Sequence, residues 1–444
     1  MSKLASARDD SRRLSVLLGL MFGFVGMGSA AAALALPDVS ADMGVTQGVA
    51  TWTITLYVLM FGVTTAVYGR ISDLVGIRPP LLCGLLTMTV GSVIAISAQT
   101  FEVLLIARMI QGAGAAAVPT LGVAIISARY EGRVRGLALG RMAGVGAAVG
   151  CLGPLAGGLL VYVEGWRAVM AVPVCSVCVL PLVWRALTRE GSGGKLDVVG
   201  AVLVTLTGAG LVLLLQSPSS GIPVAIVGLG LLVLSAPAAA AWVRHRPSGF
   251  LPVDVAGNAP AVRSALGAAG IPAAWFAYQI AVPAVMIRHG WELWEVGLLL
   301  VPSAVVACIM PRTAARLLAR LGPSRSLGLA AITAFVALLV GACGAQVVAP
   351  ALLICAGVMV TVAFGLGQPA LMEAVGNEFG VDVRGVALGL AMLVFMVGGS
   401  IGSAVIGGIG EVLGLPASLV VLSSLPIATL VVLGPGLRRP HFPQ

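Results

Sequence analysis

The sequence has very few charged residues. Only 10% of its 444 residues are Asp, Glu, Lys or Arg, whereas 59% are hydrophobic and the mean hydropathy is +1.06. Soluble domains carry about 25% charged residues, so this composition excludes a water-soluble globular protein. The 59 glycines and 25 prolines lie largely inside apolar runs, where membrane helices tolerate them. The composition therefore predicts an all-α membrane protein.

The sequence also lacks the side chains that enzymes and nucleic-acid-binding proteins need. Its three histidines fall in predicted loops or in the C-terminal tail, and its seven cysteines lie in apolar stretches. Cys175 and Cys178 form a C-x-x-C pair, but no second pair or nearby histidine completes a zinc site. The net charge is +9, yet no basic run alternates with aromatic residues as nucleic-acid binding would require. We expect no catalytic residue, metal, cofactor or nucleic-acid partner.

Acidic residues are missing from the middle of the apolar runs. The chain has 17 Asp and Glu residues, and those closest to the runs lie at their ends: Glu102, Glu164, Glu373 and Glu411. An ionisable group deep in a bilayer is costly and is normally functional, so this absence carries information. A cavity for lipophilic cations is expected to offer a carboxylate or a cage of aromatic rings.

What the sequence does contain is a series of long apolar runs. A membrane helix needs about 20 apolar residues, and fourteen runs meet that length. The first is not interpreted as a cleaved signal peptide, because it lacks a convincing cleavage site. The fourteen predicted spans cover residues 14–36, 48–69, 80–98, 103–127, 136–162, 166–185, 197–216, 222–243, 262–286, 295–316, 325–345, 348–374, 384–409 and 415–436.

The placement of the basic residues predicts the orientation. With both termini in the cytoplasm, 22 Lys and Arg residues lie in inner segments and two, Arg167 and Arg288, lie in outer loops. Inner loops of membrane proteins are enriched in such residues, and removing one span would invert every later loop. An even number of spans is therefore expected. The excess of Arg over Lys, with abundant Ala, Gly and Val, is typical of a GC-rich genome and favours a bacterial plasma-membrane protein.

Two short motifs recur at nearly the same offset, which indicates two related halves. Arg135-Gly-Leu-Ala-Leu-Gly140 returns as Arg384-Gly-Val-Ala-Leu-Gly389, and the segment 69–76 has a degenerate copy at 315–322. The first six spans are too short to fill this offset, so spans 7 and 8 are predicted to be inserted. The expected segments are a cytoplasmic N-terminus (1–13), an N-terminal six-helix bundle (14–190), two inserted helices (191–250), a C-terminal six-helix bundle (251–436) and a cytoplasmic tail (437–444).

The turn between spans 2 and 3 carries the motif Gly69-x3-Asp73-x2-Gly76-x-Arg78. Its glycines allow a tight turn, and Asp73 can accept hydrogen bonds at a helix N-terminus. Arg70, Arg78 or Arg135 could supply its guanidinium partner. Such a pair would form a latch that holds the cytoplasmic side closed in one state; an ordinary charged loop is the alternative.

Spans 4 and 5 carry two further motifs, Arg108-x2-Gln111-Gly112 and Gly150-x2-Gly153-Pro154-x2-Gly157-Gly158. In this order, the three motifs resemble those of the major facilitator superfamily. The fourteen spans, together with Trp52, Tyr57, Trp166, Arg167 and Asp197, resemble its fourteen-helix drug–proton antiporter family. The resemblance implies that Arg108 takes part in proton-linked switching. It also implies that the glycine face of span 5 packs against a second-half partner, expected to be span 13; ordinary small-residue packing is the alternative.

Span 1 departs from the family's pattern. Counted from Ala35-Leu36-Pro37, Gly28 stands where the family has an aspartate, Ala30 replaces a threonine and Ala33 replaces an asparagine. The usual cavity carboxylate is therefore absent. Asp73 and Glu164 are the remaining candidates for the group that carries the proton.

The basic residues within the spans, Arg108 and Arg141, bear on the charge of the cargo. Arg141 lies roughly 7 Å into span 5 at about 1.5 Å per residue, within snorkelling reach of the cytoplasm. If both arginines face the cavity, the preferred cargo is neutral or anionic. The other cavity candidates, each of which could instead face lipid or the interface, are Trp52, Tyr57, Trp275, Tyr278, Gln279, Gln368, Phe395 and Met396.

Together these features predict proton-coupled efflux of a small hydrophobic or amphipathic compound, such as an antibiotic or a secondary metabolite. The two bundles would rock about a central cavity, with the cargo, protons and the lipid bilayer as partners and a monomer as the expected state. A facilitator or importer on the same fold is the alternative. A membrane-embedded enzyme would need a catalytic cluster, and a sensor would need longer soluble segments.

Overall fold

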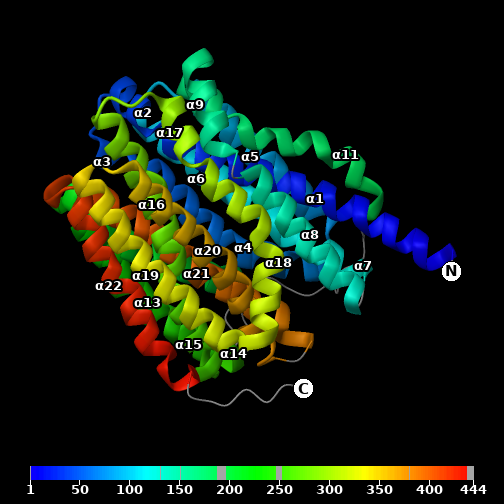
Figure 1. The fold of residues 1–444 in the computed structure, drawn as a ribbon. Helices are drawn as coiled ribbons and strands as arrows, with labels where there is room; N and C mark the ends of the chain where they lie inside the picture. The colour runs from blue at the N-terminus through cyan, green and yellow to red at the C-terminus, as the bar shows by residue number, and fades with distance from the viewer. Residues whose placement is uncertain are drawn as a thin grey trace.

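The computed structural model describes residues 2–130, 132–150, 152–187, 197–246, 253–379 and 381–437, and every regular element in them is a helix (Figure 1). The elements of the first six spans are α1 (Ser2–Leu34), α2 (Leu36–Met43), α3 (Gln47–Ala50), α4 (Trp52–Val75), α5 (Arg78–Ser97), α6 (Phe101–Ala115), α7 (Ala117–Arg129), α8 (Gly132–Gly150), α9 (Gly153–Glu164), α10 (Trp166–Val169), α11 (Leu180–Val183) and the 3-10 helices η1 (Val172–Val179) and η2 (Trp184–Ala186).

The remaining elements form spans 7 to 14. They are α12 (Val198–Ser220), α13 (Ile222–His245), α14 (Val253–Gly257), α15 (Ala259–Ala268), α16 (Gly270–Arg288), α17 (Leu293–Leu299), α18 (Val301–Leu321), α19 (Pro323–Val347), α20 (Pro350–Gly376), α21 (Val381–Leu413) and α22 (Leu415–Leu437). Fourteen of the described stretches are long and apolar enough to cross a membrane. Each coincides with one predicted span, so the predicted all-α class and span count are confirmed.

Prolines explain the break in four of the five spans that consist of two helices each; in the fifth, span 2, the break between α3 and α4 lies at Thr51. Spans 4, 5, 9 and 10 break between α6 and α7, α8 and α9, α15 and α16, and α17 and α18. In each case a proline lies within the first three residues of the second helix: Pro119, Pro154, Pro272 and Pro302. Proline lacks the N–H that would continue the hydrogen-bond ladder and favours the first turn of a helix. The sequence thus bends these spans locally without ending them.

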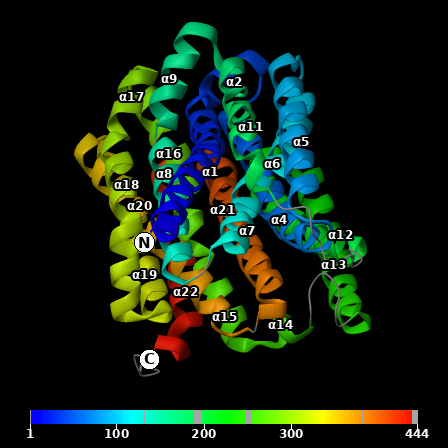
Figure 2. The same cartoon turned by 90° about the vertical axis from the view of Figure 1, so that its right-hand side faces the viewer.

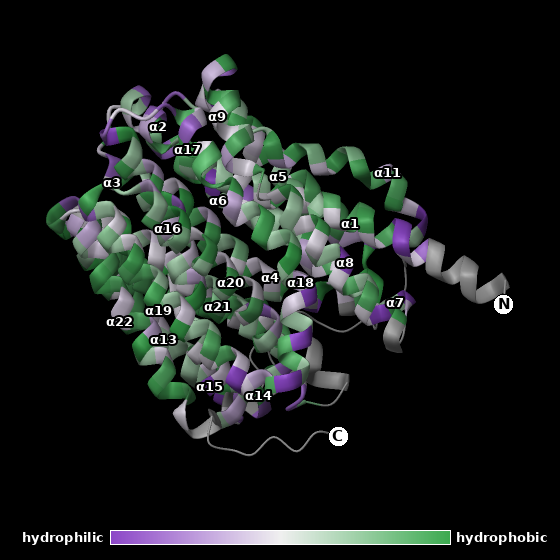
Figure 3. Ribbon diagram, viewed as in Figure 1, coloured by the Kyte–Doolittle hydropathy of each residue, from purple (hydrophilic) through white to green (hydrophobic). Residues whose placement is uncertain are grey.

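The hydrophobic residues are spread along the middle of the molecule, and hydrophilic residues gather toward its two ends (Figure 3). One end holds α2, α3, α9 and α17, and the other holds α14, α15 and the beginning of α1 (Figure 1). We call the first the outer end and the second the inner end, following the prediction from the basic residues. Helix α1 begins at Ser2, so the predicted N-terminal segment 1–13 is largely helical. Of the predicted tail, residues 438–444 lie outside the described part.

The contacts repeat between the two halves of the chain. Span 1 packs against span 5 and span 3 against span 4; in the second half, span 9 packs against span 13 and span 11 against span 12. The repeated motifs occupy matching places, since residues 135–140 and 384–389 lie on α8 and α21. Helices α4 and α18 end alike, at Gly76 (φ 82°) and Gly322 (φ 77°). Glycine adopts this left-handed conformation without steric cost. These matches support two related halves, whose residue boundaries stay a prediction.

The two halves meet along two lines of contact, which we call seams. The internal repeat relates one seam to the other, because span 2 corresponds to span 10 and span 5 to span 13. Helix α4 packs against α21, and the α8–α9 span packs against the α17–α18 span. Span 13 was the expected partner of span 5, and that expectation is wrong: the second-half partner is span 10. The reason is the symmetry itself, because spans 5 and 13 are equivalent members of the two seams. The glycines of span 13 face span 2 and span 9 instead.

The inserted helices α12 and α13 pack against each other, and α12 also contacts α4 and α21. In Figure 2 the pair lies to one side of the molecule, beside the lower part of α4. Only 11% of the most apolar window of α13 is buried, so most of its surface is left to lipid. The insertion therefore covers the span 2–13 seam from outside and leaves the span 5–10 seam uncovered.

Candidate functional site

The turn between α4 and α5 consists of Gly76, which has a positive φ of 82°, and Ile77, whereas Gly69 lies inside α4. Its arginine, Arg78, donates a hydrogen bond from Nη2 to the carbonyl oxygen of Trp184 (3.3 Å), and its guanidinium lies 5.3 Å from the centre of the Trp184 ring. Arg78 therefore ties this turn to the inner end of span 6, while Arg135 is exposed. The side chain of Asp73 lies outside the described residues, so the latch stays a prediction.

Arg108 is buried inside the first half, with 1% of its surface exposed. Its Nε donates to the carbonyl oxygen of Thr53 (3.0 Å), its Nη1 donates to the Gln111 side chain, and its guanidinium lies 4.2 Å from the centre of the Tyr57 ring. Gln111 in turn donates to Ser92 Oγ (2.6 Å) and to the carbonyl oxygen of Met170 (2.9 Å). Arg108 and Gln111 thus connect spans 2, 3, 4 and 6.

This network has no carboxylate in the described part of the chain. Hydrogen bonds to a charged group are worth about 1.5–3 kcal/mol each, and a desolvated cation–π contact about 2 kcal/mol. Such neutral partners offset part of the cost of burying a guanidinium. Two polar atoms in the network, Arg108 Nη2 and Tyr57 Oη, are buried without a hydrogen-bond partner among the described residues. Gly112 is needed here because a Cβ would overlap the Tyr57 backbone.

The place of the missing span 1 carboxylate is occupied by a proline. A Cβ built on Gly28 would lie 2.6 Å from Cδ of Pro173 and closer still to its Cγ. Pro173 lies in η1, the 3-10 segment of span 6 that packs against α1. No aspartate side chain fits at residue 28 in this structure. The absence therefore reflects a changed contact between spans 1 and 6 as well as a changed residue.

The span 5 glycines face two different partners. A Cβ on Gly153 would lie 2.7 Å from the carbonyl oxygen of Met27, and one on Gly157 would lie 2.8 Å from Cα of Ala31, both in α1. A Cβ on Gly158 would lie 3.0 Å from the carbonyl oxygen of Leu293 in α17. Through these contacts, span 5 joins span 1 to the second half at close backbone distance. Gly150 and Pro154, the other two residues of the motif, lie on the same span.

The second half contributes an aromatic cluster. The rings of Trp275 and Phe364 have centres 5.0 Å apart, and those of Phe364 and Phe395 are 5.5 Å apart. Gln368, one turn from Phe364 on α20, donates from Nε2 to the sulfur of Met392 (3.6 Å). Three of the predicted cavity residues thus come together on spans 9, 12 and 13. Phe364 was missed, because a lone Phe in an apolar run gives no distinguishing signal.

The other predicted cavity residues lie apart from this cluster. Trp52 donates from Nε1 to Ser220 Oγ (2.7 Å) in α12, and Tyr278 donates to the carbonyl oxygen of Leu353 (2.8 Å) within the second half. Arg141, half-buried, donates to Ser15 Oγ (3.2 Å) on α1. Gln279 is half-buried, and Met396 packs against Gly62 on the span 2–13 seam. Their cavity roles stay a prediction.

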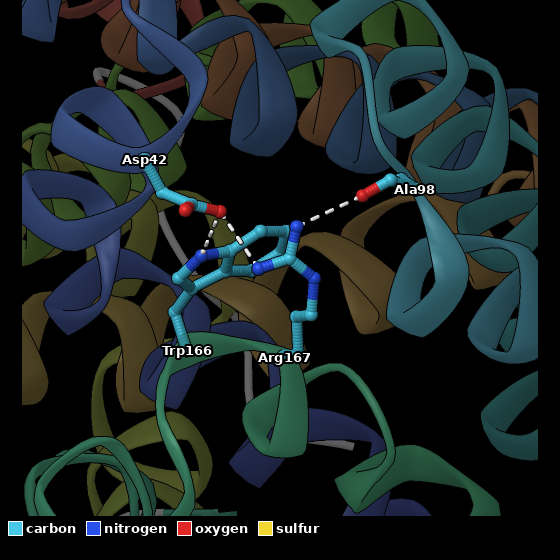
Figure 4. Close-up of polar contacts among 4 residues, drawn as sticks. All are labelled: Asp42, Ala98, Trp166 and Arg167. Atoms are coloured by element: carbon cyan, nitrogen blue, oxygen red, sulfur yellow. Dashed lines mark hydrogen bonds and ion pairs between the residues drawn. The ribbon is translucent and has the colours of Figure 1, made fainter.

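Four residues form a polar clamp at the outer end (Figure 4), where Asp42 Oδ2 accepts hydrogen bonds from Trp166 Nε1 (3.0 Å) and Arg167 Nη1 (2.7 Å). Arg167 also donates from Nη2 to the carbonyl oxygen of Ala98 (3.0 Å). The hydrogen bonds from Arg167 and Trp166 lower the pKa of Asp42, whereas burial raises the pKa of Asp38 on the same helix. The clamp joins the outer ends of spans 1, 3 and 6. Its contacts could not be predicted from the sequence, because the residues lie far apart in the chain.

Comparison with known proteins gives the family context. The family model of the Major Facilitator Superfamily matches residues 18–403. The chain is 31% identical over 226 residues to EfpA, an uncharacterized MFS-type transporter of Mycobacterium tuberculosis, covering 50% of this chain and 42% of that one. It is 27% identical over 234 residues to the methylenomycin A resistance protein of Bacillus subtilis, covering 51% and 50%.

A third relative is the cephamycin export protein CmcT of Amycolatopsis lactamdurans, 32% identical over 298 residues, covering 62% of this chain and 59% of that one. The chain thus spans less than two thirds of the length of these curated relatives. Among solved structures, a POT family transporter in complex with a thioalcohol-conjugated peptide superposes with a TM-score of 0.72 at 12% identity, covering 96% of each chain. At that identity the likeness shows the fold.

Proposed function

Because the chain belongs to the Major Facilitator Superfamily, a family of transporters, we propose that it exports a small hydrophobic or amphipathic compound in exchange for protons. The fourteen apolar helices and the bacterial relatives support a multi-pass place in a bacterial plasma membrane. Relatives named for antibiotic resistance and antibiotic export support the outward direction and an antibiotic-like cargo.

The observation that carries the proposal is the seam made by the span 5 glycine face. At Gly158 this face touches the backbone of α17 in the second half, and at Gly153 and Gly157 it touches α1. Close backbone contact between halves seals one side of a transporter while the other side is free to open. With the orientation predicted from the basic residues, this seal would lie at the outer end, which supports a transporter that loads cargo from the cytoplasm.

The expected cargo is neutral or anionic. No described acidic residue lies in the middle of a span, and the interior offers Arg108 and the ring cluster of Trp275, Phe364 and Phe395. Without a carboxylate, a cation is left with the faces of these rings as its partners and meets the like charge of Arg108, whereas rings and amides suit an apolar body with hydrogen-bonding groups. Asp73 and Glu164 remain the proposed candidates for the proton carrier.

The test is an efflux assay in a bacterial host that lacks its own drug exporters. Cells that express the wild-type chain should accumulate less of a neutral or acidic antibiotic than cells carrying the empty vector. An uncoupler should abolish the difference, because each proton supplies about 2.3 kcal/mol per 100 mV. Asp73→Asn should reduce it. Accumulation that is unchanged by the uncoupler would favour a facilitator, and resistance to cationic dyes alone would contradict the cargo class.

A further inference from the structure

A cavity of about 310 Å³ lies at the outer end between the two halves. The first half contributes residues from α1, α2 and α3, and the second contributes residues from α16, α21 and α22. None of the nine predicted cavity residues lines it. Its polar lining consists of Thr46, Gln47, Thr51, Arg288 and Glu411. We call this space the outer cavity.

Two opposite charges face the outer cavity without pairing. Arg288 ends α16 and donates from Nη2 to Gln47 Oε1 (2.9 Å), across the boundary between the halves. Its other guanidinium N–H groups make no hydrogen bond to a described residue. Glu411, near the end of α21, lies against Gly48 and has neither a hydrogen bond nor an ion pair with the described residues. Both side chains are exposed.

The rest of the lining is apolar. Leu36, Ile280, Ile406 and Leu415 contribute aliphatic surface between the charged side chains. Ligand pockets range from roughly 300 to 1,000 Å³ and combine apolar walls with a few placed polar groups, so the outer cavity has the size for a small molecule. A guanidinium binds a carboxylate through two parallel hydrogen bonds, and a carboxylate binds an ammonium.

We propose that the outer cavity binds a small zwitterion with an apolar body, its carboxylate on Arg288 and its ammonium on Glu411. A ligand with only a negative charge would be repelled by Glu411 and would leave it without a partner. A ligand with only a positive charge would be repelled by Arg288 and would leave that side chain without a carboxylate. This proposal rests on the proposed export function: in an exporter, a site at the outer end would bind the cargo just before its release. A zwitterion carries no net charge, in agreement with the cargo class proposed above.

The test uses three probes with one carbon skeleton: L-phenylalanine (zwitterion), phenethylamine (cation) and 3-phenylpropanoate (anion). Binding of each radiolabelled probe to the full-length protein in nanodiscs is measured by equilibrium dialysis at pH 7. Phenylalanine should bind about tenfold more tightly than either singly charged probe, since one hydrogen bond to a charged group corresponds to at least that factor. Equal affinity for the three probes would overturn the proposal.

Two variants assign the charges. Glu411→Gln should lose the preference for phenylalanine over 3-phenylpropanoate and keep the preference over phenethylamine, and Arg288→Gln should show the reverse. Glu102→Gln, an exposed acid at the outer end that does not line the cavity, should bind like the wild type. If both cavity variants keep the wild-type preferences, the proposal is wrong. Binding in nanodiscs needs no proton gradient. A failure of the zwitterion proposal in this assay is therefore distinguishable from a failure of the proposed proton-driven efflux.

Discussion

The span 2–13 seam and the span 5–10 seam are equivalent by the internal repeat, but they are packed differently. Along the first, contacts continue almost from end to end. Gly407 lies against Thr51 at the outer end, Thr55 shares a hydrogen bond with Ser403 (2.9 Å), and a Cβ on Gly389 would lie 3.2 Å from Cα of Ala66 toward the inner end. Helix α12 then covers this seam from outside.

The span 5–10 seam is closed over only part of its length. A Cβ on Gly158 would touch α17, and one on Gly144 would lie 3.5 Å from Cγ of Pro311. Further toward the inner end, a Cβ on Gly140 or Gly136 would have no neighbour within 4 Å among the described residues outside its own helix. From this difference we expect the halves to part first between spans 5 and 10, and the seam under the inserted helices to stay closed.

The largest expected effect is at the outer part of the span 5–10 seam. Gly158→Leu should reduce efflux at least tenfold, because overpacking costs about 1–3 kcal/mol and the neighbour at 3.0 Å is backbone, which cannot rotate away. The measurement is the uncoupler-sensitive efflux of a neutral or acidic antibiotic in the assay described above. The matched control is Gly140→Leu on the same span, which should retain most of the activity. Equal loss in both variants would contradict the proposed difference along the seam.

A smaller effect is expected on the span 2–13 seam. Thr55→Val and Ser403→Ala each remove one partner of the hydrogen bond between the halves. A double-mutant cycle on thermal unfolding in detergent should give a coupling free energy of about 0.6 kcal/mol, the average for such pairs in a membrane protein. Efflux should change little, because this seam stays closed. Efflux loss as large as that of Gly158→Leu would show that both seams must open.

The smallest effect is expected at the outer clamp, where α10 packs against α9 of the span 5–10 seam. Arg167 and Trp166 lower the pKa of Asp42, so the clamp contributes stability that is present above the ordinary aspartate pKa of about 4. This contribution is lost as the pH falls through the lowered pKa. Between pH 7 and pH 3, the unfolding midpoint of the wild type should therefore fall slightly more than that of Asp42→Asn. Glu164→Gln should follow the wild type.

Most of the fold could be predicted because membrane insertion depends on properties that a sequence shows directly. The length of the apolar runs and the placement of arginines predicted fourteen spans, and the repeated motifs at 135–140 and 384–389 lie on helices that make similar contacts in the two halves. What could not be predicted was how equivalent helices meet. A glycine face shows that a close approach exists, but it does not name the partner, and so span 13 was expected where span 10 packs.

The candidate site was predicted only in part. Motif residues such as Arg108 and Gln111 proved to be neighbours in one network, because short spacing on a helix places side chains on one face. Residues proposed from type alone fared differently: Trp275 and Phe395 share a cluster through Phe364, whereas Trp52 binds the inserted helix. The outer clamp and the outer cavity depend on residues far apart in the chain, and no spacing rule brings Gln47 to Arg288.

The contact between Gly28 and Pro173 constrains which substitutions this chain can accept. Because the proline ring fills the space that an aspartate at residue 28 would need, Gly28→Asp alone would be excluded on steric grounds. A smaller residue at 173 would have to accompany it. The span 1 carboxylate therefore cannot be introduced into this packing by one substitution.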